Sequence, residues 1–231
     1  MAWLIATYRP VSLFSLRASQ TTSSGGRTNL VPTMYAVKMA LVDAGFRSGH
    51  DGAALFEMVK PLGVRFEPPP DVVVSNTFLK IRREPKEKKP GGPAYIPTVG
   101  FREFCYFAGD LRVALEIAGL PDPTVGLLRE LLAGINYLGK RGSFLQFLGC
   151  EIQQSLGPGF ARPMEELTGA FPVDTVVQYL DDLGSEATWS RVNSYSEESA
   201  KLGRDRVFVA VALPYRRVAS SRGYTRYIRA V

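Results

Sequence analysis

The segment between residues 84 and 97 constrains the fold more than any other part of the sequence. Its centre reads Pro90-Gly91-Gly92-Pro93 and is surrounded by lysines, so it cannot be packed in a core. Residues 72–81 alternate and are rich in β-branched side chains, and residues 98–107 are also typical of a strand. The sequence therefore predicts two long strands joined by a projecting hairpin or loop.

Helices and further strands are predicted on both sides of this hairpin. Residues 3–8 form a first strand, which is expected to continue past Pro10 over residues 13–16. Pro32 and Gly45 bracket a helix over residues 33–42. Leucines at helical spacing predict a second long helix over residues 123–136, with Thr124 as its N-cap. A short helix is expected over residues 51–60, and strands are expected over residues 111–117, 173–180 and 207–213, the last in a central position.

In order, these elements give strand, helix, strand, strand, helix and strand. We therefore predict an α+β fold with the ferredoxin-like βαββαβ pattern that the RNA-recognition motif shares. This domain is expected to cover residues 1–150, with a projecting β-hairpin thumb at about residues 84–98. Residues 151–231 are expected to form a smaller β-rich C-terminal extension, either separate or part of the same domain.

Positive charge is concentrated in two segments. The 231 residues include 28 Lys and Arg against 22 Asp and Glu, for a net charge of +6. Residues 80–89 and 204–229 together hold thirteen of the basic residues and three of the acidic ones, so the remainder is slightly acidic. Solubilising charge normally interleaves both signs, whereas such concentration favours binding of a polyanion.

Other features place the chain among cytoplasmic proteins. No apolar run reaches the about 18 residues of a membrane span. The N-terminal segment lacks the basic start and the length of a signal peptide, and is interpreted as a first strand. Cys105 and Cys150 stand far apart in apolar surroundings, which predicts buried thiols and no disulfide.

Candidate catalytic groups are few. His50 is the single histidine, in a predicted loop, and its spacing to the cysteines does not suit a zinc site. The glycine-rich and nucleophile motifs of common enzymes are missing, so we expect no metal and no cofactor. Metal-free RNA cleavage by tyrosine, lysine and histidine stays open. Tyr179-Leu180-Asp181-Asp182 resembles the Tyr-x-Asp-Asp turn of reverse transcriptases, so a polymerase-like palm using Asp181 and Asp182 is a further alternative, beside an ordinary turn.

Glycines and basic residues alternate in Gly139-Lys140-Arg141-Gly142, directly after a predicted helix. Glycine permits close approach of the backbone, and the cations suit phosphate, although a basic helix C-terminus is also ordinary. Residues 215–227 interleave arginines with tyrosines, which fits either RNA binding or a flexible basic tail.

Three segments together resemble a known family. The first is Phe14-Ser15-Leu16-Arg17, followed by a polar loop and Pro32-Thr33-Met34-Tyr35. The second is the strand over residues 101–107 with Arg102-Glu103, and the third is Tyr137-Leu138-Gly139-Lys140-Arg141-Gly142-Ser143. In this order they resemble the CRISPR-associated RAMP proteins, specifically the type I Cascade subunit that caps the 5′ handle of the guide RNA.

The resemblance implies a non-catalytic subunit of an antiviral ribonucleoprotein. It implies binding of the 5′ handle of crRNA and contacts with the neighbouring backbone RAMP subunit and the large subunit; contact with target DNA stays open. Some family members cleave precursor crRNA with tyrosine, lysine and histidine, so a metal-independent endoribonuclease is the alternative. The single loop histidine favours the non-cleaving role.

Candidate site residues follow from charge and resemblance together. The RNA-binding candidates are Arg17, Arg27, Lys38, Lys80, Arg82, Arg102, Lys140 and Arg141, and the thumb candidates are Lys86, Lys88, Lys89 and Tyr95. Arg102 could equally pair with an acid such as Glu103, and Lys38 could lie on the exposed face of its helix.

Overall fold

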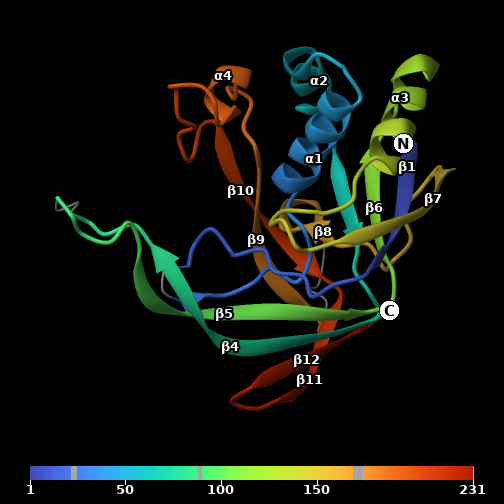
Figure 1. Cartoon of the computed structure of the whole chain (residues 1–231). Helices are drawn as coiled ribbons and strands as arrows, with labels where there is room; N and C mark the ends of the chain where they lie inside the picture. Colours follow the sequence, from blue (N-terminus) through green and yellow to red (C-terminus); the bar gives the residue numbers. More distant parts are fainter. Residues whose placement is uncertain (22–24, 88–89, 169–173, 231) are drawn as a thin grey trace.

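A four-stranded antiparallel sheet forms the first part of the computed structural model, which describes residues 1–21, 25–87, 90–168 and 174–230. Its strands come in the order β3-β6-β1-β7. Along the chain the sheet and its helices are β1 (Trp3–Pro10), α1 (Met34–Arg47), β3 (Val64–Glu67), β6 (Leu111–Glu116), α3 (Asp122–Ala133) and β7 (Leu145–Gln153). This is the predicted succession of strand, helix, strand, strand, helix and strand (Figure 1).

The second strand of that succession is not the predicted one, and no strand was predicted for its last member, β7. Residues 72–81 belong to another sheet, and β3 takes their place beside β6. β3 has four residues and ends directly before Pro68. Its alternation of apolar and polar residues is too short to show a strand separate from the proline-rich break that follows. The predicted break at residues 108–110 is where the chain passes between the two sheets. There Gly109 has a φ of +120°, and a Cβ would lie 2.6 Å from Pro70 Cδ.

The predicted long hairpin is confirmed and forms part of a five-stranded sheet. β4 (Asp71–Arg83) and β5 (Ile96–Ala108) pair antiparallel along their whole length, from Asp71 opposite Ala108 to Arg83 opposite Ile96. The sheet order is β11-β12-β4-β5-β2, with β2 (Gly25–Gly26), β11 (Tyr215–Ser220) and β12 (Tyr224–Arg229). Figure 1 shows the closed end of this hairpin projecting beyond the other elements.

A third sheet of three strands has the order β8-β10-β9. Its members are β8 (Arg162–Pro163), β9 (Val176–Leu183) and β10 (Arg206–Leu213), with the short helices η1 (Met164–Glu166) and α4 (Trp189–Val192) in the connections. The central position predicted for residues 207–213 is confirmed. β9 runs three residues beyond its predicted end, and the predicted start at Val173 lies outside the described residues.

Two helix boundaries differ from those predicted. The Ala36 N–H donates to Thr33 Oγ1 at 3.1 Å and begins α1, but the helix continues past Gly45 to Arg47. Gly45 is needed for close packing, because a Cβ there would collide with Leu55 of α2 (Gly52–Val59). α3 begins after Pro121 without a side-chain cap, so the N-cap prediction for Thr124 is wrong.

Residues 13–16 do not continue the first strand. Phe14 makes a single antiparallel bridge to Cys105, and its ring stacks on Phe107 at a centroid distance of 5.1 Å. Pro10 ends β1, and the chain beyond it becomes a loop laid over the edge of β5.

One hydrophobic core joins all three sheets. It contains Leu4 of β1, Val72 of β4 and Leu213 of β10, and Tyr215 donates its hydroxyl to the Pro69 carbonyl at 2.7 Å. The strands after residue 150 therefore share both a core and a sheet with the earlier part of the chain. Both thiols are free, and Cys105 is buried as predicted, whereas Cys150 is only half-buried because it lies on β7 at the edge of its sheet. Within the described residues, no helix is long and apolar enough to cross a membrane.

Candidate nucleic-acid interface

The basic turn that follows α3 has the backbone that its glycines suggested. Gly139 and Gly142 have φ values of +74° and +110°, in the region that glycine adopts without strain. Gly139 also lacks room for a side chain, because a Cβ would lie 2.7 Å from Leu16 Cδ1. The side chains of Lys140 and Arg141 are exposed between the two glycines. The turn thus presents two adjacent cations on a fixed backbone.

The loop after β1 is fastened to this turn. The Ser12 hydroxyl donates to the Gly142 carbonyl at 2.6 Å, and the Ser15 N–H donates to Ser143 Oγ at 3.1 Å. These bonds place Arg17 beside the turn, where it is exposed and has no ion pair among the described residues. Three cations from two segments far apart in the sequence therefore lie on one surface.

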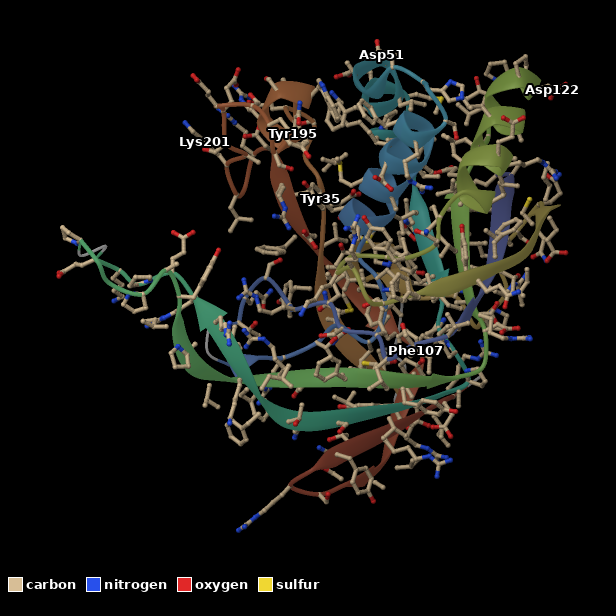
Figure 2. All side chains as sticks on the ribbon, in the orientation of Figure 1. Tyr35, Asp51, Phe107, Asp122, Tyr195 and Lys201 are labelled. Carbon is tan, nitrogen blue, oxygen red and sulfur yellow. The ribbon has the colours of Figure 1, made fainter. Side chains whose placement is uncertain are left out.

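A cavity of about 270 Å³ opens beside this surface, which we name the first cavity. Arg17, Tyr35, Gly139, Asp181 and Arg206 are among its lining residues. Figure 2 shows Tyr35 at the N-terminal end of α1, the helix that packs against β9. The cavity thus draws its walls from the loop, the basic turn, α1 and the third sheet.

An arginine and a tyrosine form one wall of the first cavity. The Arg206 guanidinium lies over the Tyr35 ring at 4.4 Å from its centroid and forms an ion pair with Asp181. Arg206 Nε is buried without a hydrogen-bond partner among the described residues. Burial raises the pKa of Tyr35, so its hydroxyl stays protonated near neutral pH. The stacked ring and guanidinium give this wall a flat surface with polar edges, and the Asp181 carboxylate balances the charge of Arg206.

A second cavity, of about 390 Å³, lies on the other side of the same loop. Arg27, Glu103, Gln178 and Tyr227 line it, so it joins the loop to the hairpin, β9 and β12. The Thr28 N–H donates to Glu103 Oε2 at 2.9 Å, which fixes that carboxylate. Arg27 is exposed and has no ion pair among the described residues. The described parts of this loop, residues 17–21 and 25–28, therefore contribute to both cavities, with Arg17 lining the first and Arg27 the second.

The outer half of the hairpin carries Lys80 and Arg82. Both are exposed and share a face with Phe78 and Phe101, whose rings meet edge to face at 5.6 Å. Nearer the body, the same face buries Val74. The hairpin thus changes from a core-forming surface to an exposed, basic and aromatic one along its length.

The remaining hairpin candidates differ in their exposure. Arg102 lies on the opposite face, donates to the Phe101 carbonyl at 2.6 Å and covers Gly26, where a Cβ would be 3.0 Å from Arg102 Cδ. Lys86 and Tyr95 are exposed at the closed end. Lys88 and Lys89 lie outside the described residues.

A known protein is similar to this chain over most of its length. No known family profile matches the chain. The chain is 24% identical over 209 residues to the CRISPR-associated protein Cas5 of Archaeoglobus fulgidus, a match that covers 87% of this chain and 88% of the relative. The chain is similar to a CRISPR-associated protein. The predicted resemblance to the CRISPR-associated RAMP proteins is thereby confirmed.

Two solved structures are also similar to this chain. A CRISPR protein from Archaeoglobus fulgidus has a TM-score of 0.47 at 13% identity, covering 100% of this chain and 93% of that one. A chain from a CRISPR RNA-guided surveillance complex also has a TM-score of 0.47, at 15% identity, covering 99% and 91%. Both scores are too low to support a shared function, so the relationship to Cas5 rests on the sequence match.

Lys38 is not available to a nucleic acid. Its side chain is 3% exposed, and its ammonium group contacts Asp182 Oδ1 at 2.8 Å and the Lys60 carbonyl at 2.9 Å. Burial lowers the pKa of Lys38 and raises that of Asp182, and their mutual attraction offsets part of each shift. The RNA-binding prediction for Lys38, and its alternative as an exposed helical residue, are corrected to a structural ion pair.

The polymerase-like alternative does not fit the structure. Asp181 and Asp182 lie within β9, where adjacent side chains point to opposite faces, so they cannot bind the same pair of metal ions. Each is neutralised by its own cation, Arg206 or Lys38. The described residues contain no cluster of three or more metal-binding side chains.

His50 lies far from the basic turn. It follows the C-terminal end of α1, whereas Tyr35, which lines the first cavity with Arg17 and Gly139, lies in the first turn of the helix. At about 1.5 Å per residue, α1 separates these ends by about 20 Å. The structure therefore does not bring His50 together with Arg17 or Lys140 as a cleaving cluster requires.

The arginine-rich C-terminal segment is not a flexible tail. Its strands β10, β11 and β12 are ordered in two sheets, and several arginines have structural partners. Their ion pairs include Arg204 with Asp205, Arg206 with Asp181, Arg226 with Asp71 and Arg229 with Glu67. Arg216, Arg217 and Arg222 remain exposed.

Three residues at or near these cavities were not among the site residues predicted from the sequence: Tyr35, Tyr179 and Arg206. Tyr35 and Arg206 wall the first cavity, and Tyr179 is exposed on β9. The alternation around Tyr179, which puts it opposite the face of Leu180, is the signal that could have shown its outward position.

Proposed function

We propose that the chain is a non-catalytic RNA-binding subunit of a type I CRISPR effector complex, holding the 5′ handle of crRNA. The observation that carries this proposal is the placement of Arg17 beside the turn of Lys140 and Arg141. Exposed cations without protein partners are free to contact phosphates, and guanidinium groups suit their geometry. The aromatic and arginine walls of the neighbouring cavity suit unstacked bases.

The fold supports this role. We propose that the β3-β6-β1-β7 sheet with α1 and α3 is a ferredoxin-like domain, because its strand order and antiparallel pairs match that topology. We assign the thumb to the closed end of the β4–β5 hairpin. Residues 151–231 would then be a β-rich extension of the same domain, since β12 pairs with β4.

The partners are proposed from the family resemblance. The projecting hairpin, with Lys80, Arg82 and Phe78 exposed, suits contact with a neighbouring backbone RAMP subunit and its bound RNA. The large subunit is the second protein partner we propose. Cleavage of precursor crRNA is the alternative activity. Whether RNA incubated with the chain stays intact or is cleaved distinguishes the two.

A salt titration of RNA binding tests the proposal. We expect repeat-derived RNA to bind the full chain, and the Lys140→Ala/Arg141→Ala variant to bind more weakly. Because two phosphate contacts are lost, the slope of log K against log salt should decrease by about 1.4 in magnitude. Lys201→Ala/Arg129→Ala is the matched control, since both side chains are exposed at other sites.

The same samples test catalysis. Repeat RNA incubated with the chain in EDTA should remain intact. In the salt titration, an unchanged slope in the Lys140→Ala/Arg141→Ala variant would contradict the proposed phosphate contacts of these two residues. Specific cleavage that disappears in His50→Ala would establish the endoribonuclease instead.

A further inference from the structure

The outward face of β9 exposes apolar side chains that the core does not use. Val177 and Tyr179 are 43% and 53% exposed, whereas Leu180 is fully buried on the other face. Phe208, opposite Asp181 on β10, is half-buried on the same outward face. A row of this kind on an ordered strand indicates contact with another molecule.

This row connects the two cavities. Val177 lines the second cavity and Asp181 lines the first, and Tyr179 lies midway between them on the same face. Four residues of strand span about 13 Å. At about 3.4 Å per base along one strand, that span corresponds to about four stacked bases.

Charge along this track favours a polyanion. Arg27 stands at one end and Arg17 at the other, both exposed and without ion pairs among the described residues. Asp181 is 5% exposed and neutralised by Arg206, and Glu103 is held by the Thr28 N–H. An acidic polypeptide segment would leave the apolar side chains of the surface without a matching partner. A purely apolar segment would leave the two arginines without one.

We propose that single-stranded RNA crosses the outward face of β9 from the second cavity to the first, with a base stacked on Tyr179. Arg27 and Arg17 hold phosphates at the two ends of this track. This inference rests on the proposed function and extends it to a defined path. Tyr179 acts through the face of its ring, since stacking accepts any base.

Affinity measurements with three variants test the role of Tyr179. Tyr179→Ala should weaken binding of repeat RNA by about 5- to 150-fold, because stacking on an aromatic ring contributes about 1–3 kcal/mol per base. Tyr179→Phe should bind as the wild type does. The matched control is Tyr195→Ala, which removes a tyrosine that is 99% exposed in another loop. Thermal melting of each variant checks that folding is unchanged.

The salt dependence separates stacking from charge. Tyr179→Ala should lower affinity at every salt concentration without changing the slope, whereas Arg17→Ala and Arg27→Ala should each reduce the slope by about 0.7. With 4-thiouridine placed at successive positions, the crosslinks to β9 should fall within a window of about four nucleotides.

Two outcomes would overturn this path while leaving the proposed function intact. One is wild-type affinity for Tyr179→Ala, together with crosslinks outside β9. The other is wild-type RNA affinity for Tyr179→Ala with failure to assemble with partner subunits, which would make this face a protein interface. Failure of the wild-type chain to bind RNA would instead contradict the proposed function itself.

Discussion

Lys38 and Asp182 form an ion pair between α1 and β9, in which the Asp182 side chain keeps 20% of its surface exposed. The Lys38 side chain is 3% exposed and also donates to the Lys60 carbonyl, and the Leu183 N–H donates to Asp182 Oδ1 at 2.7 Å. Removal of one partner from such a pair leaves an uncompensated buried charge. The pair therefore fixes α1, and with it Tyr35, against the third sheet.

We predict that Lys38→Met lowers the free energy of unfolding by about 3–5 kcal/mol. The double variant Lys38→Met/Asp182→Asn should recover most of this loss, because the amide carries no charge and still accepts from the Leu183 N–H. Urea unfolding of the wild type, both single variants and the double variant measures the coupling. Additive single effects would contradict the pair.

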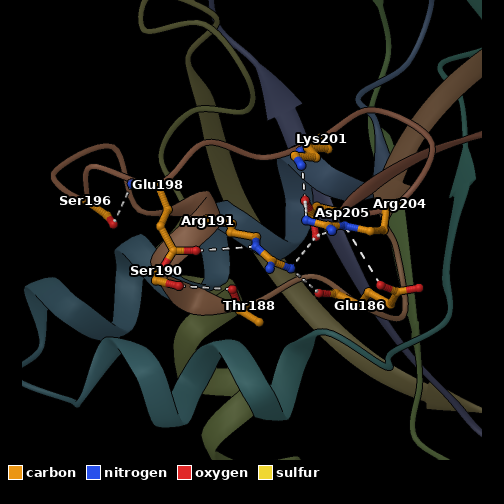
Figure 3. Close-up of polar contacts among 9 residues, drawn as sticks. All are labelled: Glu186, Thr188, Ser190, Arg191, Ser196, Glu198, Lys201, Arg204 and Asp205. Atoms are coloured by element: carbon orange, nitrogen blue, oxygen red, sulfur yellow. Dashed lines mark hydrogen bonds and ion pairs between the residues drawn. The ribbon is translucent and has the colours of Figure 1, made fainter.

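Asp205 holds the connection between α4 and β10. Figure 3 shows Arg191 and Arg204 contacting its carboxylate, at 3.2 and 3.0 Å, and the Lys201 N–H also donates to it. The carboxylate is buried. The hydrogen bond from Arg204 and that from the Lys201 backbone lower the pKa of Asp205 to about 2.

This shift predicts a defined pH dependence. An unfolded aspartate has a pKa of about 3.9, so the unfolded chain binds more protons than the folded one between about pH 2 and pH 4. The contribution of Asp205 to stability is complete above this window and lost as the pH falls through it. Melting temperatures of the wild type and Asp205→Asn should differ at neutral pH and converge toward pH 2. A constant difference over this range would contradict the assignment.

At the scale of elements, glycine positions the basic turn. Gly139 has a positive φ and lies against Leu16, whereas Gly126 lies within α3 with no atom near its missing Cβ. Substitution of glycine by alanine is therefore expected to have opposite effects on stability at the two positions.

We expect Gly139→Ala to destabilise the chain by more than about 1 kcal/mol, because strain and collision act together. It should also weaken RNA binding, since Lys140 and Arg141 would shift. Gly126→Ala should stabilise the chain by about 0.5–1 kcal/mol and leave binding unchanged. Denaturant unfolding and RNA titration on the same samples distinguish the two, and equal effects at both glycines would contradict the fixed turn.

Elements with strong local signals were predictable from the sequence. Prolines and glycines at 90–93, with the lysines before them, marked the end of the hairpin, and Pro32 marked the start of α1. β3 was missed because four residues carry too little pattern, and Gly45 misled because tertiary packing of α2 overrides its role as a helix stop. The assignment of strands to three sheets depends on distant pairings that no local pattern encodes.

For the whole molecule, the site depends on contacts between segments far apart in the chain. Charge and the family resemblance together indicated Arg17, Lys140 and Arg141 as candidates, and all three are exposed, but their proximity comes from hydrogen bonds such as Ser12 to Gly142. Charge could not distinguish Lys38, which is buried, or Arg226 and Arg229, which pair with acids. Burial and pairing are properties of the complete fold, so they required the structure.

The most direct measurement of the central claim compares the affinity of the full chain for two RNAs of equal length. One carries the repeat-derived 5′ handle, and in the other the same handle sequence is moved to the 3′ end. We predict tighter binding of the first, with the preference lost in Arg17→Ala/Lys140→Ala/Arg141→Ala but kept in Lys201→Ala/Arg129→Ala. Equal affinity of the wild-type chain for both RNAs would contradict the account.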